Sequence, residues 1–186
     1  MLAFDIETLG LINKKPLPEI TCVCLCDGDK TYCFQIWKHP ERALNEAAIL
    51  DLLDAAETIC GYNAVLFDLE YIRIGFQHHA ISDERMAAWV RKCIDPYMCA
   101  RHLSETGCKM QHMLELNGLE SKTGSGADAI VMAHEGQWEK LMAYCLMDAQ
   151  LTLQLCTKEW IHLTTFLQVH LSAKAPPVFR FFVVDA

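Results

Sequence analysis

The first seven residues join an apolar strand pattern to two carboxylates, and this pairing limits the fold more than any other feature of the sequence. Apolar residues alternate through the segment, which predicts a strand with Asp5 and Glu7 on the same face. At a rise of roughly 3.3 Å per residue the two carboxylates start about 7 Å apart, close enough to share a cation. Two acids on a buried strand repel each other and lose hydration, and a hard divalent metal is the simplest compensation. The alternative is that this end of the strand is solvated and both acids face water.

Composition narrows the functional classes. The 186 residues amount to about one domain, and 52% of them are apolar, enough for a full core. The 16 basic and 24 acidic side chains give a formal net charge of −8, which argues against a protein that coats nucleic acid or an anionic membrane by charge alone. No apolar stretch reaches the roughly 20 residues of a membrane-spanning helix, and the acids in the first apolar run argue against a signal peptide. We therefore expect a soluble protein.

Ten cysteines raise the question of disulfides or zinc, and their spacing argues against both. No Cys-x-x-Cys pair occurs, and zinc knuckles need that pairing. Cys22, Cys24 and Cys26 alternate with apolar residues, so a strand would point all three to one face as small buried hydrophobes. Ten thiols without a secretion signal indicate a reducing, intracellular compartment.

The order of the predicted elements indicates one α/β domain with a mixed sheet flanked by helices. We expect strands at residues 1–7, 20–26, 31–37, 58–61 and 92–95, with the second and third joined as a hairpin. We expect helices at residues 41–56, 65–76, 83–91, 98–104, 109–116, 138–157 and 159–171. Residues 1–175 would form the domain, and residues 176–186 would form a C-terminal arm in which 178–186 is a strand or an extended tail.

Two further clusters set polar side chains among apolar ones. Asn63, Phe67 and Asp68 follow the short strand at 58–61, where a helix would pack on the sheet. An aspartate in such a place is ordinarily a helix cap or faces solvent. Tyr144 and Asp148 are spaced i, i+4, which puts them side by side on one face of the helix at 138–157. A tyrosine beside a carboxylate is ordinarily a structural hydrogen bond.

In combination and in this order, the three clusters resemble the motifs of the DEDD superfamily of 3′–5′ exonucleases, whose fold is similar to ribonuclease H. Phe4-Asp5-Ile6-Glu7-Thr8 resembles the first motif of that family, and Tyr144 through Asp148, with Leu151-Thr152, resembles the third. The tyrosine resembles the subgroup seen in proofreading domains of DNA polymerases. The rival histidine subgroup would need a histidine near Ala143, and that position is not histidine. The resemblance covers residues 2–155.

The resemblance implies a metal-dependent hydrolysis of phosphodiester bonds with two divalent ions, Mg²⁺ or Mn²⁺. Asp5 would bridge both ions, and Glu7, Asp68 and Asp148 would complete their coordination. Tyr144 would orient the attacking water by a hydrogen bond.

The resemblance also implies where the substrate lies. Thr8 and Leu9 would contact the terminal nucleotide, and Asn63 and Phe67 the penultimate stretch of the strand. Lys122 lies in a glycine-containing segment before the last motif and is a candidate contact to the substrate strand. The 3′ end of single-stranded DNA is favoured through the resemblance alone, because no residue pattern discriminates a 2′-hydroxyl. A polymerase or a replication or repair protein is the implied partner.

Two other functions stay open at this point. A non-catalytic module on the same fold would bind nucleic acid or protein, and it would need none of the four carboxylates or the tyrosine. An endonuclease of the ribonuclease H type would also use carboxylates and two metals. The presence of all five side chains weighs against the binding module, and the placement of Tyr144 four residues before Asp148 favours the exonuclease over the endonuclease.

Overall fold

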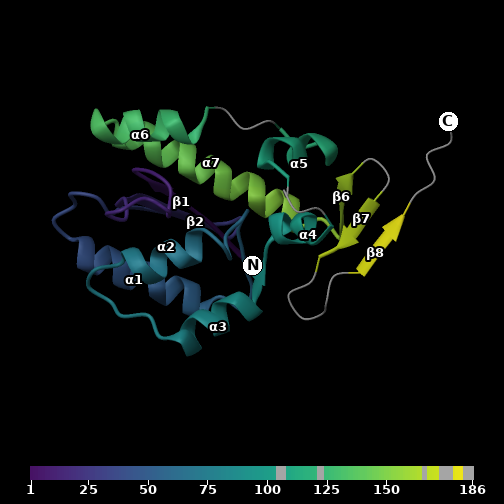
Figure 1. Ribbon diagram of the computed structural model, residues 1–186, viewed down its shortest axis with the longest axis horizontal. Helices are drawn as coiled ribbons and strands as arrows, with labels where there is room; N and C mark the ends of the chain where they lie inside the picture. The colour runs from purple at the N-terminus through teal and green to yellow at the C-terminus, as the bar shows by residue number, and fades with distance from the viewer. Residues whose placement is uncertain (104–107, 121–123, 165–166, 172–177, 182–186) are drawn as a thin grey trace.

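A five-stranded mixed sheet lies at the centre of the computed structural model, which describes residues 1–103, 108–120, 124–164, 167–171 and 178–181 (Figure 1). Its strands are β1 (Leu2–Thr8), β2 (Ile20–Cys26), β3 (Thr31–Gln35), β4 (Ile59–Cys60) and β5 (Cys93–Ile94). They are ordered β3-β2-β1-β4-β5, antiparallel from β3 to β1 and parallel from β1 to β5. This arrangement confirms the predicted α/β class with a mixed sheet.

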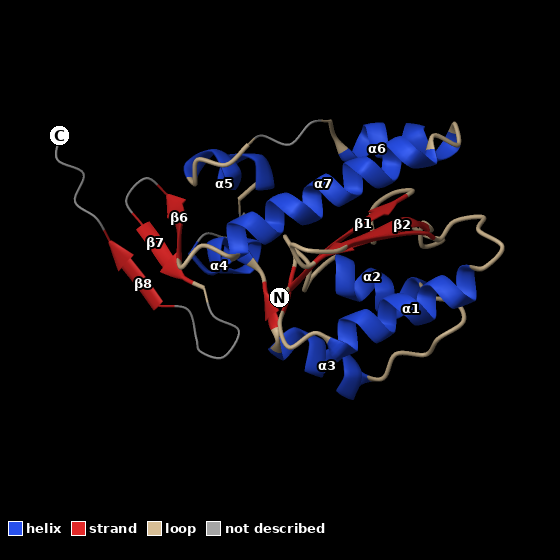
Figure 2. Cartoon of the chain, turned by 180° about the vertical axis from the view of Figure 1, so that it is seen from behind, coloured by secondary structure: helices blue, strands red, loops and turns tan. Residues whose placement is uncertain are grey.

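Helices cover both faces of this sheet (Figures 1 and 2). One face carries α1 (Arg42–Ala55), α2 (Asp68–Gly75) and α3 (Asp83–Arg91), and the other carries α6 (Gly126–His134) and α7 (Trp138–Cys156). The alternation of β1 decides which side chains meet which layer, because successive residues of a strand point to opposite faces. Leu2, Phe4 and Ile6 lie in the core cluster formed with α1 and α2. Ala3, Asp5 and Glu7 therefore face α7.

The α7 layer packs closely because small side chains separate it from the sheet. Cys22 and Cys24 of β2 share a buried cluster with Cys145, and Ala3 shares another with Ala149. A buried stripe of α7 carries Tyr144 and Asp148, and all of its members are less than a tenth exposed: Tyr144, Asp148, Leu151, Thr152 and Leu155. The burial predicted for the cysteines of β2 is confirmed.

A second sheet replaces the helix predicted at residues 159–171, so that prediction is wrong. β6 (Trp160–Thr164) and β7 (Leu167–His170) pair antiparallel, and β8 (Val178–Phe181) extends the sheet in the order β6-β7-β8. Burial along β6 alternates with a period of two, with Ile161 and Leu163 inside. That period is the signature of a strand with one buried face. The buried face packs with α5 (Met110–Leu116) and α4 (Pro96–Leu103) at the end of α7.

The helix α6 was not among the predicted elements. Its start lies just after Gly124, and the glycines there suggest an interruption rather than a helix. The backbone N–H of Ser125 donates to Asp128 Oδ2 over 2.8 Å, the return half of a capping box. The Ser-x-x-Asp spacing is therefore the sequence signal from which this start could have been predicted.

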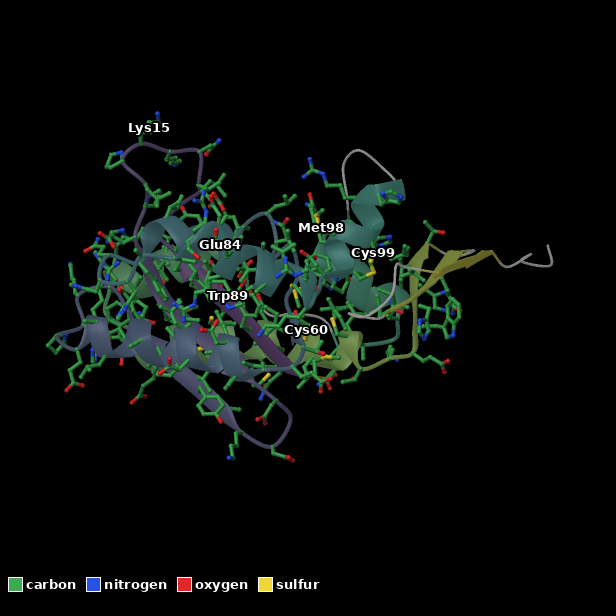
Figure 3. All side chains as sticks on the ribbon, turned by 90° about the horizontal axis from the view of Figure 1, so that it is seen from below. Lys15, Cys60, Glu84, Trp89, Met98 and Cys99 are labelled. Atoms are coloured by element: carbon green, nitrogen blue, oxygen red, sulfur yellow. The ribbon has the colours of Figure 1, made fainter. Side chains whose placement is uncertain are left out.

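The connection between β1 and β2 projects from the sheet, with Lys15 at its tip (Figure 3).

None of the described helices is long and apolar enough to cross a membrane.

A buried ion pair ties α1 to the end of α2. The Glu46 carboxylate is fully buried and accepts from Arg42 Nε over 2.7 Å and from the backbone N–H groups of Gln77 and His78. Arg42 in turn donates to the carbonyl of Gly75, the last residue of α2, and to Glu19 before β2. One carboxylate thus organises the segment that follows the helix carrying Asp68.

We expect Glu46→Ala to lower the free energy of unfolding by about 3 to 5 kcal/mol, because it removes one charged partner of the largely buried Arg42 guanidinium and leaves the backbone donors of Gln77 and His78 unpaired. The half-buried surface pair of Glu70 with Arg73 is the matched control, and Glu70→Ala should cost about 1 kcal/mol or less. Urea unfolding of both variants measures the difference. Equal losses would show that the Glu46 pair is no more important than a surface pair.

Candidate active site

Three of the four predicted carboxylates meet at the open end of β1. Asp5 and Glu7 point to the face that α7 covers, and Asp148 of α7 points back at them. Oxygen atoms of Asp5, Glu7 and Asp148 all lie within 4.8 Å of one another. Glu7 and Asp148 are buried and Asp5 is half-buried. The alternative of a solvated strand end therefore does not describe this site.

The chemistry of this donor set fits a hard divalent cation. All three residues offer carboxylate oxygen, which Mg²⁺, Mn²⁺ and Ca²⁺ prefer as a ligand. Three carboxylates at this separation repel one another strongly in a partly dry interior. A cation between them converts that repulsion into attraction.

Asp68, the fourth predicted carboxylate, lies on the other side of β1. It is the first residue of α2, it is 4% exposed, and its Oδ1 accepts from the backbone N–H of Ile6 over 3.1 Å. Because β4 pairs only with Leu2 and Ala3, this N–H lies beyond the end of the parallel ladder. Burial, and after it the negative charges of Asp95 and Asp148, raise the pKa of Asp68 to about 8.

Asp95 is the site residue that the sequence reasoning missed. Its carboxylate accepts from the backbone N–H groups of Asn63 (2.9 Å), Val65 (3.1 Å), Tyr97 (3.0 Å) and Met98 (3.3 Å). Burial raises the pKa of Asp95 against the lowering effect of these four donors. An aspartate directly before Pro96 at a helix start is a signal for such a cap. The cap holds the 63–67 segment, and so Asp68, against the end of β5.

The backbone of the turn after β4 is also held in a defined conformation. A Cβ atom on Gly61 would lie 2.4 Å from the Cβ of Ala64, so no larger residue fits there without a backbone shift. Asn63 has a φ of 63°, in the left-handed region that asparagine tolerates. The turn therefore delivers Phe67 and Asp68 at a defined place beside β1.

Tyr144 lies one helical turn before Asp148 and is 7% exposed. Its ring borders a surface hollow of about 520 Å³ whose lining residues are Gly124, Asp128, Met132, Lys140, Ala143 and Met147. Tyr144 therefore touches both the carboxylate side of α7 and an open space large enough for a ligand.

The structure describes four of the five residues predicted to contact substrate. Thr8 ends β1 and donates its hydroxyl to the carbonyl of Gly10, and Leu9 packs in the cluster that contains Tyr144. Phe67 stacks at a tilt on Tyr71, with ring centroids 4.9 Å apart. Asn63 is half-buried in the turn, and Lys122 lies outside the described residues.

The raised pKa of Asp68 makes the metal-free protein less stable as the pH rises. Asp68 titrates near 3.8 in an unfolded chain and near 8 here, so between these values the folded state holds one more proton than the unfolded state. The free energy of unfolding then falls as the pH rises. In excess chelator we expect the melting temperature to fall from about pH 5 to about pH 8, and Asp68→Asn to flatten that fall because an amide does not ionise.

Asp51→Asn, which changes an exposed acid of α1, is the control and should keep the wild-type slope. An Asp68→Asn slope equal to that of wild type would contradict the raised pKa.

Comparison with known proteins agrees with this architecture. A family model described as the RNase_H superfamily matches residues 2–160. No curated protein matches the sequence significantly. Among solved structures, the chain is similar to the family B DNA polymerase of the archaeon Pyrobaculum calidifontis, with 17% identity and a TM-score of 0.61. That similarity covers 83% of this chain and only 24% of the polymerase, so it bears on the fold alone. Because the family model spans most of the sequence, the chain belongs to the RNase_H superfamily.

Proposed function

We propose that the chain is a metal-dependent 3′–5′ exonuclease of the tyrosine subgroup of the DEDD superfamily. The observation that carries the proposal is the meeting of Asp5, Glu7 and Asp148 within 4.8 Å, with Tyr144 one turn before Asp148 on the same helix. A binding module needs no such concentration of buried negative charge, which costs stability unless a cation balances it.

The carboxylates are suited to hold two divalent ions, Mg²⁺ or Mn²⁺. Asp5 would be the ligand shared by both ions, and Glu7, Asp68 and Asp148 would complete the set that holds them. Such a pair of ions, when bound, activates a water and stabilises the leaving 3′ oxygen. Asp68 must lose its proton to act as a ligand, so metal binding should release protons near neutral pH.

The protein itself would contribute to the reaction by holding the reacting side chains in fixed positions. Asp5 and Glu7 are fixed by the strand pairs of β1 with β2, and Asp148 and Tyr144 by the packing of α7 on that pair. Tyr144 would hold the attacking water through its hydroxyl. Because these side chains are rigidly mounted on secondary structure, little reorganisation remains at the moment of reaction.

The substrate we propose is the 3′ end of a nucleic acid strand, with DNA preferred. Thr8 and Leu9, directly after Glu7, would contact the terminal nucleotide, and Asn63 and Phe67 would contact the next stretch. Lys122 would contact the strand backbone. We further propose that residues 1–175 form the exonuclease domain, that residues 176–186 form an appended arm, and that a polymerase or another replication or repair protein is the partner.

Asp148→Asn should abolish degradation of single-stranded DNA, with a loss of at least about 10³-fold, larger than that for one positioned hydrogen-bond donor. Wild type with Mg²⁺ or Mn²⁺ should shorten a 5′-labelled strand one nucleotide at a time, and chelator should stop it. Asp51→Asn, an exposed acid on α1, is the control and should keep wild-type activity.

Each other outcome of this assay has a definite meaning. Internal cuts without a ladder would indicate an endonuclease of the ribonuclease H type. Binding without cleavage under every metal condition would indicate a non-catalytic module. Faster degradation of RNA than of DNA would contradict the sugar preference and leave the chemistry intact.

Tyr144→Phe should retain metal binding and lower kcat by about 10² to 10³-fold, because only the hydroxyl that positions the water is lost. Tyr32→Phe, which removes a hydroxyl from β3, should leave kcat unchanged. If the two variants have equal kcat, Tyr144 is a packing residue and the tyrosine-subgroup assignment fails.

A further inference from the structure

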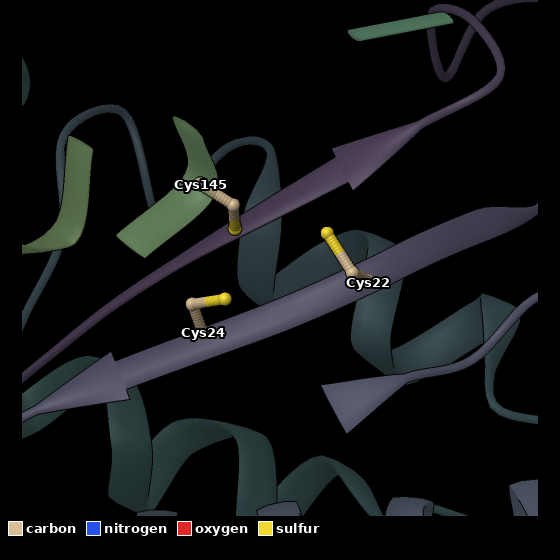
Figure 4. Close-up of side chains that lie close together, drawn as sticks. All are labelled: Cys22, Cys24 and Cys145. Carbon is tan, nitrogen blue, oxygen red and sulfur yellow. The ribbon is translucent and has the colours of Figure 1, made fainter. Parts of the chain in front are cut away.

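Three thiols converge behind the carboxylate cluster. Cys22 and Cys24 come from β2 and Cys145 comes from α7, and in Figure 4 their sulfur atoms point toward one another. The three Sγ atoms lie within 4.8 Å of one another, and all three residues are 0% exposed. The sequence pattern placed Cys22 and Cys24 on one face of a strand, but only the packing of α7 adds the third thiol.

We propose that Cys22, Cys24 and Cys145 form a second metal site, which binds a soft, thiophilic cation of the Cu(I) or Zn(II) class. Thiolate sulfur selects ions of this class, just as carboxylate oxygen selects Mg²⁺ and Mn²⁺. Three ligands about 2.3 Å from a common ion lie about 4 Å from one another, so sulfur atoms already within 4.8 Å need only small shifts. This inference does not depend on the proposed nuclease activity.

The sulfur atoms are oriented before any ion arrives. The Cys145 thiol donates to the main-chain carbonyl of Asp5 over 3.3 Å, and the Cys24 thiol donates to the carbonyl of Met142 over 3.4 Å. Both acceptors belong to the rigid elements β1 and α7. On binding, the ion displaces thiol protons, which pass to the solvent.

A fourth cysteine provides a route of entry to this buried site. Cys33 of β3 is exposed and stands directly opposite Cys24 in the antiparallel pair of β2 with β3. Opposed residues share a face of the sheet, with Cβ atoms about 4.5 to 5.5 Å apart. A soft ion captured by Cys33 can therefore pass to Cys24 by ligand exchange.

The two metal sites would select different ions although they share the same strands. Cys24 is the register partner of Asp5, and Cys22 is the partner of Glu7, so each of these thiols on β2 stands opposite a carboxylate on β1. Hard cations bind thiol sulfur weakly, so excess Mg²⁺ should not displace the soft ion.

The test is anaerobic titration of the reduced full chain with Cu(I), and separately with Zn(II), against a coloured chelator. Wild type should bind one more equivalent of at least one of these ions than Cys145→Ala does, and millimolar Mg²⁺ should not change that difference. Cys156→Ala is the matched control, because it removes an equally buried thiol from the same helix. It should bind as wild type does. X-ray absorption at the bound metal should show sulfur neighbours at about 2.3 Å.

Two more variants keep the test decisive. Cys24→Ala should lose the same equivalent if Cys145→Ala proves too unstable to titrate. Cys33→Ser should slow uptake several-fold and leave the final stoichiometry unchanged. Equal stoichiometry in wild type, Cys145→Ala and Cys24→Ala for both ions would overturn the proposal and leave the three thiols as packing residues. If wild type binds the extra equivalent of Cu(I) but not of Zn(II), or the reverse, the result identifies which of the two ions the site takes.

Discussion

Mutual repulsion among Asp5, Glu7 and Asp148 is the constraint on which the rest of the structure around the site depends. Their oxygen atoms lie within 4.8 Å of one another, a separation that carboxylates in water would avoid. The backbone imposes it, because β1 is fixed by its pairing with β2, and α7 is fixed by a buried stripe that includes Asp148 itself. The energy of packing these two elements thus balances the electrostatic cost of the site until a cation neutralises it.

The distance between α7 and the sheet follows from the small side chains in that layer. Cysteine and alanine occupy the facing positions, including Cys22, Cys24, Cys145 and Ala149. Leucine at these places would hold the helix further away and separate Asp148 from Asp5. The opposite layer shows the contrast, since Phe4, Leu25 and Ile49 fill the space under α1 and α2. A layer of small side chains is therefore a geometric requirement of the carboxylate cluster, and the close approach of the three thiols is a consequence of the same packing.

Sequence reasoning succeeded where a local period carried the information. Alternation placed Asp5 and Glu7 on one face of β1, and the i, i+4 spacing placed Tyr144 beside Asp148. It failed where the decisive contact is distant or the local signals conflict: the helix predicted at 159–171 is a hairpin whose buried residues pack on α5. Asp95 went unnoticed because its role depends on two backbone N–H groups some thirty residues earlier, in the 63–65 turn. The period of a sequence pattern predicts which side chains share a face of a strand or helix. Only the tertiary contacts show which of these faces pack together.

The balance of charge has a consequence for how such a site can hold a polyanion. With a formal net charge of −8, the protein as a whole repels a phosphate backbone, and the carboxylates add to that repulsion while they lack cations. Two bound divalent ions would cancel the charge of the four carboxylates at this site. Affinity for a nucleic acid strand should therefore depend strongly on divalent cations and only weakly on monovalent salt, since few phosphates are neutralised by side chains. A strand held in this way would be held mainly where it meets the ions, which agrees with the proposed action at a strand end.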